Sequence, residues 1–111
     1  MNILKITEII GTPNAILHKF GLQLFENLDK LISEKKVVTV SFLGVENLTS
    51  GFLNASFGNL YKKHGTALEK LLFLSELNDE EWRKKFEEAK LLALNPEKAQ
   101  LIDAAIADLF E

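Results

Sequence analysis

Two hydroxyl residues, Thr49 and Ser50, stand immediately before the apolar pattern of a predicted helix that ends near Gly65. A hydroxyl at such a position accepts a hydrogen bond from a backbone N–H group and caps the helix. The same N–H groups and the helix dipole also favour an anion, including a phosphate carried by Ser50. The two residues therefore predict either a simple cap or a phosphorylated switch, and the pattern leaves open which residue is the cap.

Other residues that could perform chemistry do not form a recognisable catalytic, metal or cofactor pattern. His18 and His64 fall on different predicted helices, where we expect them at the surface or its boundary. The three glycines Gly44, Gly51 and Gly58 match neither the P-loop nor the dinucleotide-binding spacing. Cysteine is absent. We expect no enzymatic activity, no cofactor and no metal site.

The overall charge argues against a nucleic-acid-binding surface. The net charge is −3, and the longest basic runs are pairs of lysines, whereas nucleic-acid affinity depends on clustered Lys and Arg. No apolar run has the roughly 20 residues that span a bilayer, and the first residues lack a basic leader. These features favour a cytoplasmic protein that binds neither membrane nor nucleic acid.

The first half of the chain predicts a strand, a helix and a second strand. Apolar residues among polar ones indicate a strand over residues 2–10, which Gly11 ends. Thr12 and Pro13 then suit the start of a helix that runs to about Ser33. The short β-branched run Val37 to Leu43 is typical of a strand buried on both faces, and residues 44–49 form the following turn.

The second half predicts a helix from Ser50 to His64, a strand or alternatively a helix from Leu68 to Leu74, and two further helices. One helix begins at Asn78 with a capping box to Glu81 and ends at Asn95 and Pro96. Its inner stripe consists of Trp82, Phe86, Ala89 and Ala93. The last helix has apolar residues at Leu101 or Ile102, Ala105, Ile106 and Leu109, and we expect it to cover an edge or a face of the sheet.

This alternation predicts one α/β domain over residues 1–111, with a small, mostly parallel central sheet and helices packed on it. Val37 to Leu43 would be the central strand. Three strands form a narrow sheet, which leaves room for a fourth strand or for pairing with another copy of the chain.

The segment from Val37 to Tyr61 resembles the central strand, turn and helix of STAS domains, and it is most similar to the bacterial STAS-like family of unknown function. The similarity covers about a quarter of the chain. The matching residues are Phe42, Gly44, Val45, Ser50, Phe52, Phe57, Gly58 and Leu60.

The resemblance implies a regulatory role like that of anti-sigma factor antagonists, which a partner kinase phosphorylates on a serine in this turn. In this alignment Ser41 replaces the aspartate at the strand end, Ser50 matches the first serine, and Gly51 occupies the phosphoacceptor position. The implied partner is a signalling protein such as a histidine-kinase-like ATPase, bound through Thr49, Ser50, Gly51 and Phe52. The alternative is a small anionic ligand or nucleotide at the helix start near Ser50.

Overall fold

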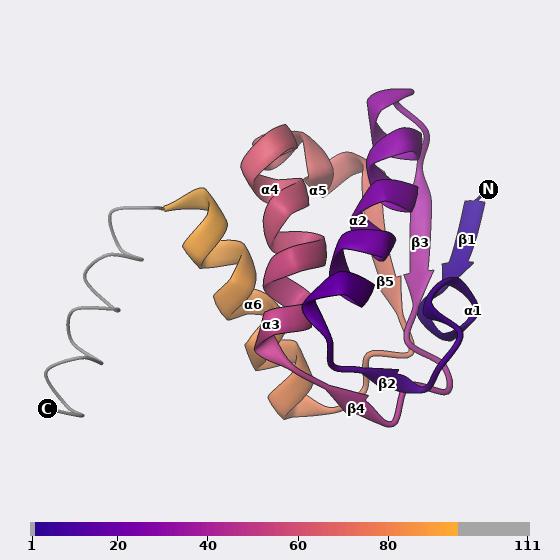
Figure 1. The fold of residues 1–111 in the computed structure, drawn as a ribbon. Coiled ribbons are helices and arrows are strands. Elements are labelled where there is room, and N and C mark those ends of the chain that lie inside the picture. Colours follow the sequence, from indigo (N-terminus) through magenta and orange to yellow (C-terminus); the bar gives the residue numbers. More distant parts are fainter. Residues whose placement is uncertain (1, 96–111) are drawn as a thin grey trace, which may run out of the picture.

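A computed structural model describes residues 2–95, which form a parallel three-stranded sheet with helices packed on one face (Figure 1). The strands are β1 (Asn2–Lys5), β3 (Val38–Ser41) and β5 (Leu72–Ser75), in the order β1-β3-β5. β3 is central, pairs in parallel with both neighbours, and buries Val38 and Val40 completely. The predicted α/β, STAS-like fold and its central strand are confirmed.

A second, two-stranded parallel sheet pairs β2 (Asn14–Ala15) with β4 (Asn47–Leu48). The Glu46 amide donates to the Pro13 carbonyl at 2.8 Å. This pairing ties the chain that leads into the second helix to the chain that leads into the third.

The helical segments cover most of the remaining described chain. They are α1 (Ile6–Ile10), α2 (His18–Ser33), α3 (Ser50–Leu53), the π-helical η1 (Asn54–Gly58), α4 (Asn59–His64), the 3₁₀-helical η2 (Gly65–Ala67), α5 (Leu68–Leu71) and α6 (Glu80–Leu94). Because α3, η1 and α4 follow one another without a break, the predicted helix from Ser50 to His64 is confirmed.

Phe57 on η1 lies at the centre of the core. Its ring stacks on Phe42 with 6.1 Å between ring centroids, and meets Phe86 of α6 edge-on at 5.1 Å. On the other side of η1, Gly21 of α2 lies so close that an added Cβ would be 2.6 Å from Ala55 Cβ. The end of β3, the π-helical turn, α2 and α6 therefore share one tightly packed core.

The first predicted strand is too long, because only Asn2–Lys5 is extended. Ile6 and Ile10 are buried one helical turn apart in α1, so their spacing reflects a helix and not a strand. Gly11 ends this helix with a φ of 72°, which glycine adopts at little cost.

The second helix begins at His18 and not at the predicted Thr12 cap. Residues 13–15 pair with the chain before α3 instead, and the Thr12 hydroxyl accepts a hydrogen bond from the Asn14 amide at 3.2 Å. Long-range backbone pairing therefore overrides a local helix signal. The predicted end at Ser33 is confirmed.

Two boundaries in the second half also differ from the predictions. Leu68–Leu71 forms a helical turn, and the strand occupies Leu72–Ser75. The cap of α6 is Asp79, whose side chain accepts from the Glu81 and Trp82 amides, so the expected Asn78 capping box is absent. The buried stripe Phe86, Ala89 and Ala93 is confirmed. The helix predicted between Leu101 and Leu109 lies outside the described residues.

Candidate functional site: the start of the third helix

Thr49 is the residue that caps the helix predicted from Ser50. Its backbone is extended, with φ −114° and ψ 157°, and its Oγ1 accepts a hydrogen bond from the Phe52 amide at 3.2 Å. The same hydroxyl donates to the Ile16 carbonyl at 2.8 Å. Thr49 therefore both caps α3 and fixes the chain that enters α2, which resolves the choice that the sequence left open.

Ser50 and Gly51 form the exposed first turn of α3. Because Thr49 supplies the capping hydroxyl, that of Ser50 is not needed for the cap. At Gly51 an added Cβ would meet nothing nearer than Thr49 Oγ1 at 4.0 Å. The turn thus has room for a side chain at residue 51 or for a larger group on Ser50.

Phe52, the fourth residue that the resemblance implies for partner binding, has no exposed surface. It packs in the core, and its carbonyl accepts a hydrogen bond from the buried Ser56 hydroxyl at 2.8 Å. Phe52 therefore anchors the turn to the hydrophobic core, while Ser50 and Gly51 remain exposed.

Two large apolar residues belong to the segment that Thr49 bonds to this turn. Ile16 and Leu17 precede α2 and are 42% and 47% exposed, and the Thr49 hydrogen bond holds Ile16 against the start of α3. We call the residues Ile16, Leu17, Thr49, Ser50 and Gly51 the Ser50 surface. The sequence pattern gave no signal for Ile16 and Leu17 as surface residues, because it predicts both inside a helix that begins at Thr12, whereas α2 begins at His18.

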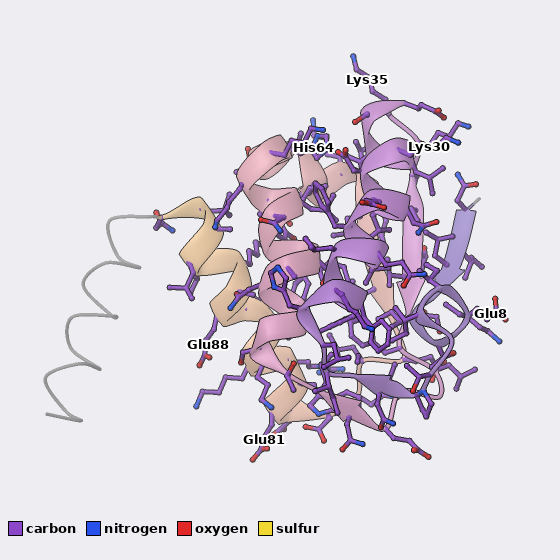
Figure 2. The ribbon with its side chains drawn as sticks, in the orientation of Figure 1. Glu8, Lys30, Lys35, His64, Glu81 and Glu88 are labelled. Carbon is purple, nitrogen blue, oxygen red and sulfur yellow. The ribbon has the colours of Figure 1, made fainter. Side chains whose placement is uncertain are left out.

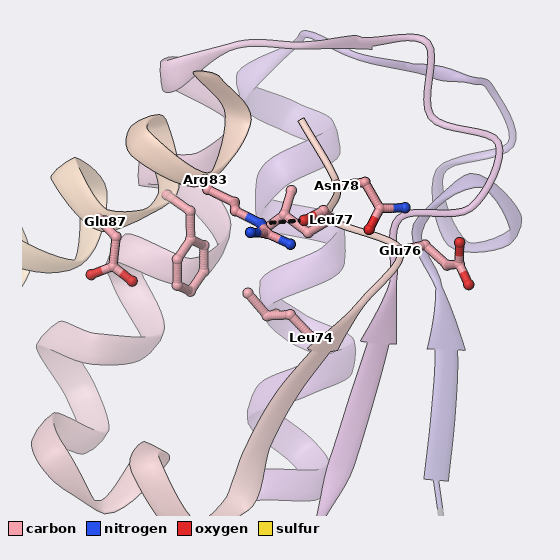
Figure 3. Close-up of a pocket in the computed structure, with 7 residues that line it drawn as sticks. Leu74, Glu76, Leu77, Asn78, Arg83 and Glu87 are labelled. Carbon is pink, nitrogen blue, oxygen red and sulfur yellow. Dashed lines mark hydrogen bonds between the residues drawn. The ribbon is translucent and has the colours of Figure 1, made fainter. Parts of the chain in front are cut away.

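A shallow hollow of about 300 Å³ opens beside Gly44, between the ends of β3 and β5. Its lining includes Trp82 and two carboxylates, Glu76 and Asp79. A neighbouring hollow of about 500 Å³ shares Glu76 and Asn78 with it, and Arg83 there donates to the Leu77 carbonyl at 2.6 Å (Figure 3). The two carboxylates make the smaller hollow acidic, whereas Arg83 places a positive charge in its neighbour.

A cluster of charged residues joins α2 to α4 at the opposite end of the molecule, near the labelled Lys35 and His64 (Figure 2). Asp29 accepts a hydrogen bond from Lys63 Nζ at 2.8 Å, and His64 Nε2 lies 2.7 Å from its other oxygen. Lys63 and, secondarily, His64 hold the pKa of the Asp29 carboxyl below its ordinary value. The sequence alone gave no signal for this cluster, because Asp29 and His64 are 35 positions apart.

The two histidines lie where the sequence predicts, with His18 exposed and His64 partly buried. Within residues 2–95, no group of three or more His, Asp or Glu side chains is placed to hold a metal ion. None of the helices in the same range combines the length and apolar character that a membrane span requires.

Comparison with protein families matches residues 21–82 to the family described as a STAS-like domain of unknown function (DUF4325). The match covers more than half of the chain, including α2 from Gly21 onward, β3, the Ser50 surface from Thr49 onward and β5. Searches of curated proteins and of solved structures gave no significant match. The chain therefore belongs to this STAS-like family.

Proposed function

We propose that this STAS-like domain is a non-catalytic regulatory module that binds a partner protein through the Ser50 surface. The observation that carries the proposal is that two exposed apolar residues, Ile16 and Leu17, belong to the segment that Thr49 bonds to the exposed turn at Ser50. A partner that covers these side chains would remove their apolar surface from water, which favours association. The exposed Ser50 hydroxyl in the bonded turn offers a site at which phosphorylation could control binding.

The rigidity of this surface supports the proposal. The Thr49 hydroxyl donates to the Ile16 carbonyl, and the Thr49 amide donates to the Ala15 carbonyl at 3.1 Å. The pairing of β2 with β4 joins the same two segments through Asn14 and Ala15. A partner would therefore meet a preformed contact and lose little free energy in ordering it.

The partner class that fits the family resemblance is a bacterial signalling protein, such as a histidine-kinase-like ATPase, in the cytoplasm. The acidic hollow at Glu76 and Asp79 lies at the same end of the sheet as the turn. A partner with a basic residue beside its apolar contact would complement both features.

Regulation would act by phosphorylation of Ser50, since Gly51 has no hydroxyl and the Thr49 hydroxyl already makes two hydrogen bonds. A phosphate on Ser50 adds nearly two negative charges beside the N-terminal amides of α3. The fold should survive, because Ser50 is exposed, while the charge of the binding surface changes.

The first test is affinity capture from native lysate with three forms of the full chain: the wild type, Leu17→Asp and Leu91→Asp. Leu17→Asp should lose a stoichiometric partner, because it places a charge in the apolar contact. This variant should keep its fold, since Leu17 is the N-cap of α2 and aspartate caps well. Leu91→Asp is the matched control, because Leu91 is 51% exposed on α6 outside this surface. Equal capture by both variants would argue against the Ser50 surface.

The second test concerns the switch. With the captured partner purified, Ser50→Asp should change its dissociation constant tenfold or more, about 1.4 kcal/mol, while Ser50→Ala should leave it unchanged. Intact-mass measurement of the protein from its native host should find a phosphate that maps to Ser50. Unmodified protein in every growth phase, together with normal binding by Ser50→Asp, would leave Ser50 without a regulatory role.

The alternative of a small anionic ligand or nucleotide at this turn rests on the exposed first turn of α3. Lys85 also favours an anion there, because its Nζ donates to the Leu48 carbonyl at 3.3 Å, just before Thr49. Calorimetric titration with common nucleotides at moderate salt separates the two proposals. Heat at micromolar concentration that disappears in Ser50→Ala would favour the nucleotide and count against the protein partner.

A further inference from the structure

A hollow of about 750 Å³ lies at the C-terminal end of α2, whereas the Ser50 surface lies at the N-terminal end of that helix. Its apolar lining consists of Ile32, Ala67 and Leu71. Two further lining residues, Lys35 and His64, are labelled at this end of the molecule in Figure 2. We call it the Lys35 hollow. Sites for small molecules usually measure roughly 300 to 1,000 Å³, so the Lys35 hollow is large enough for one.

Two lysines of the lining, Lys35 and Lys70, give the Lys35 hollow a surplus of positive charge. Within residues 2–95, neither lysine forms an ion pair. The carboxylates that flank them in the sequence are already paired: Asp29 with Lys63, Glu34 with Lys36, and Glu69 with Lys90. The protein as a whole has a net charge of −3, so the surplus is local. It would attract an anion to this hollow.

The backbone of Lys35 supports a functional role for its side chain. Lys35 follows α2 in the left-handed conformation, with a φ of 60°, and its amide donates to the Ile32 carbonyl at 2.9 Å. Glycine is the usual residue at such a position after a helix, because a Cβ is strained there. The chain therefore holds a long cationic side chain where glycine would be more stable, and strain of this kind is concentrated at functional sites.

The chemistry of the lining indicates the class of ligand. Lysine ammonium groups donate charge-assisted hydrogen bonds to a carboxylate, and their flexible stems can bring two ammonium groups to one anion. Lys35 and Lys70 are both exposed, so their ammonium groups can reorient while the stems lie along apolar surface. The apolar side chains of the lining favour a ligand with an apolar body, because such a body would leave water on binding.

We propose that the Lys35 hollow binds a small organic anion with an apolar body, such as an aromatic carboxylate, held between Lys35 and Lys70. The carboxylate would meet the two ammonium groups, and the apolar body would cover Ile32, Ala67 and Leu71. The site goes beyond the proposed partner binding, because the Lys35 hollow and the Ser50 surface share no residue.

The test is a titration of the full chain with 2-naphthoate, an aromatic carboxylate, followed through the backbone amide signals in NMR spectra. The control ligand is 2-naphthamide, which has the same rings and no charge. We expect saturable shifts at residues 33–35 and 64–71, with a dissociation constant of about 1 mM or below for a ligand of about 13 non-hydrogen atoms. The uncharged ligand should bind at least about tenfold more weakly. Raising the salt from about 0.02 M to about 0.5 M should weaken binding of 2-naphthoate but not of 2-naphthamide.

Lys35→Gly separates binding from stability. Glycine adopts this backbone conformation at little cost, so the variant should melt at a higher temperature than the wild type. It should nevertheless bind 2-naphthoate about fivefold more weakly, as expected for the loss of one charge near the anion in water. Lys70→Gln should weaken binding by a similar factor. Lys84→Gln is the matched control, because Lys84 is exposed on α6 outside the Lys35 hollow, and it should bind as the wild type does.

Equal affinity for 2-naphthoate and 2-naphthamide would overturn the proposal, as would the absence of saturable shifts. Shifts that cluster at Ser50 and Gly51 would also overturn it, because they would assign the anion to the first turn of α3. So would unchanged binding by both Lys35→Gly and Lys70→Gln. Leu17→Asp should bind 2-naphthoate normally, so a failure of this proposal and a failure of the proposed partner binding are distinguishable.

Discussion

At the scale of single residues, Thr49 has the most specific structural role in the candidate site. Its hydroxyl caps α3 and also bonds to Ile16, so Thr49→Ala removes two interactions. We expect a loss of about 1 to 2 kcal/mol in the free energy of unfolding, measured by urea denaturation. Ser50→Ala should change it by less than about 0.5 kcal/mol, as is usual at the surface. The opposite order would mean that Ser50 is the cap.

Two glycines that look alike in the sequence should respond in opposite ways to alanine. At Gly21 the added Cβ would lie 2.6 Å from the Phe52 carbonyl oxygen, whereas Gly51 faces open space. Gly21→Ala should destabilise the protein by about 1 to 3 kcal/mol through overpacking. Gly51→Ala should stabilise it by up to about 1 kcal/mol, because alanine favours helix. Thermal melting of both variants measures the difference, and destabilisation by Gly51→Ala would contradict the open turn.

At the scale of elements, Asp29 links α2 to α4 through Lys63 and His64. Because the pKa of Asp29 is lowered in the folded state, its carboxylate stabilises the fold above its ordinary pKa near 3.8. That contribution is lost as the pH falls through the lower folded value. Asp29→Asn should therefore melt at a lower temperature than the wild type at pH 6, with a loss of under about 1 kcal/mol in the free energy of unfolding for an ion pair near the surface. The difference should shrink as the pH falls below the ordinary pKa of the carboxyl.

The measurement is thermal melting of both proteins from pH 2 to pH 7 at low salt. Glu34→Gln is a suitable control, because the Glu34–Lys36 pair lies within one local turn and joins no two elements. A difference between Asp29→Asn and wild type that grows as the pH falls would contradict a lowered pKa for Asp29 in the folded protein.

At the scale of the whole molecule, Phe57 holds the sheet and the helices in one cooperative unit through Phe42 and Phe86. Phe57→Ala should destabilise the protein by about 3 to 5 kcal/mol, a large part of the stability of a domain this size. Urea denaturation followed by circular dichroism should show one transition with a lower midpoint. Leu22→Ala, at a side chain 37% exposed, should cost much less. Separate transitions for sheet and helices would argue against a single core.

The sequence by itself determined the elements whose signal is local. The strand within Val37 to Leu43, the helix from Ser50 to His64 and the inner stripe of α6 follow from short-range apolar patterns. Burial of the strand on both faces was wrong, because Val37 and Leu43 lie outside it and are 43% and 52% exposed, and Thr39 is partly exposed. The family resemblance rested on the same segment, because the residues that carry it form that strand, turn and helix.

Only the tertiary structure decided the boundaries and contacts that depend on distant parts of the chain. Residues 13–16 bond to residues 46–49, which delays the start of α2 to His18 and exposes Ile16 and Leu17 beside Ser50. The hydrogen bond of Thr49 to Ile16 spans 33 positions and that of His64 to Asp29 spans 35. Local propensity cannot predict such contacts, because their free energy arises only when packing brings the two segments together.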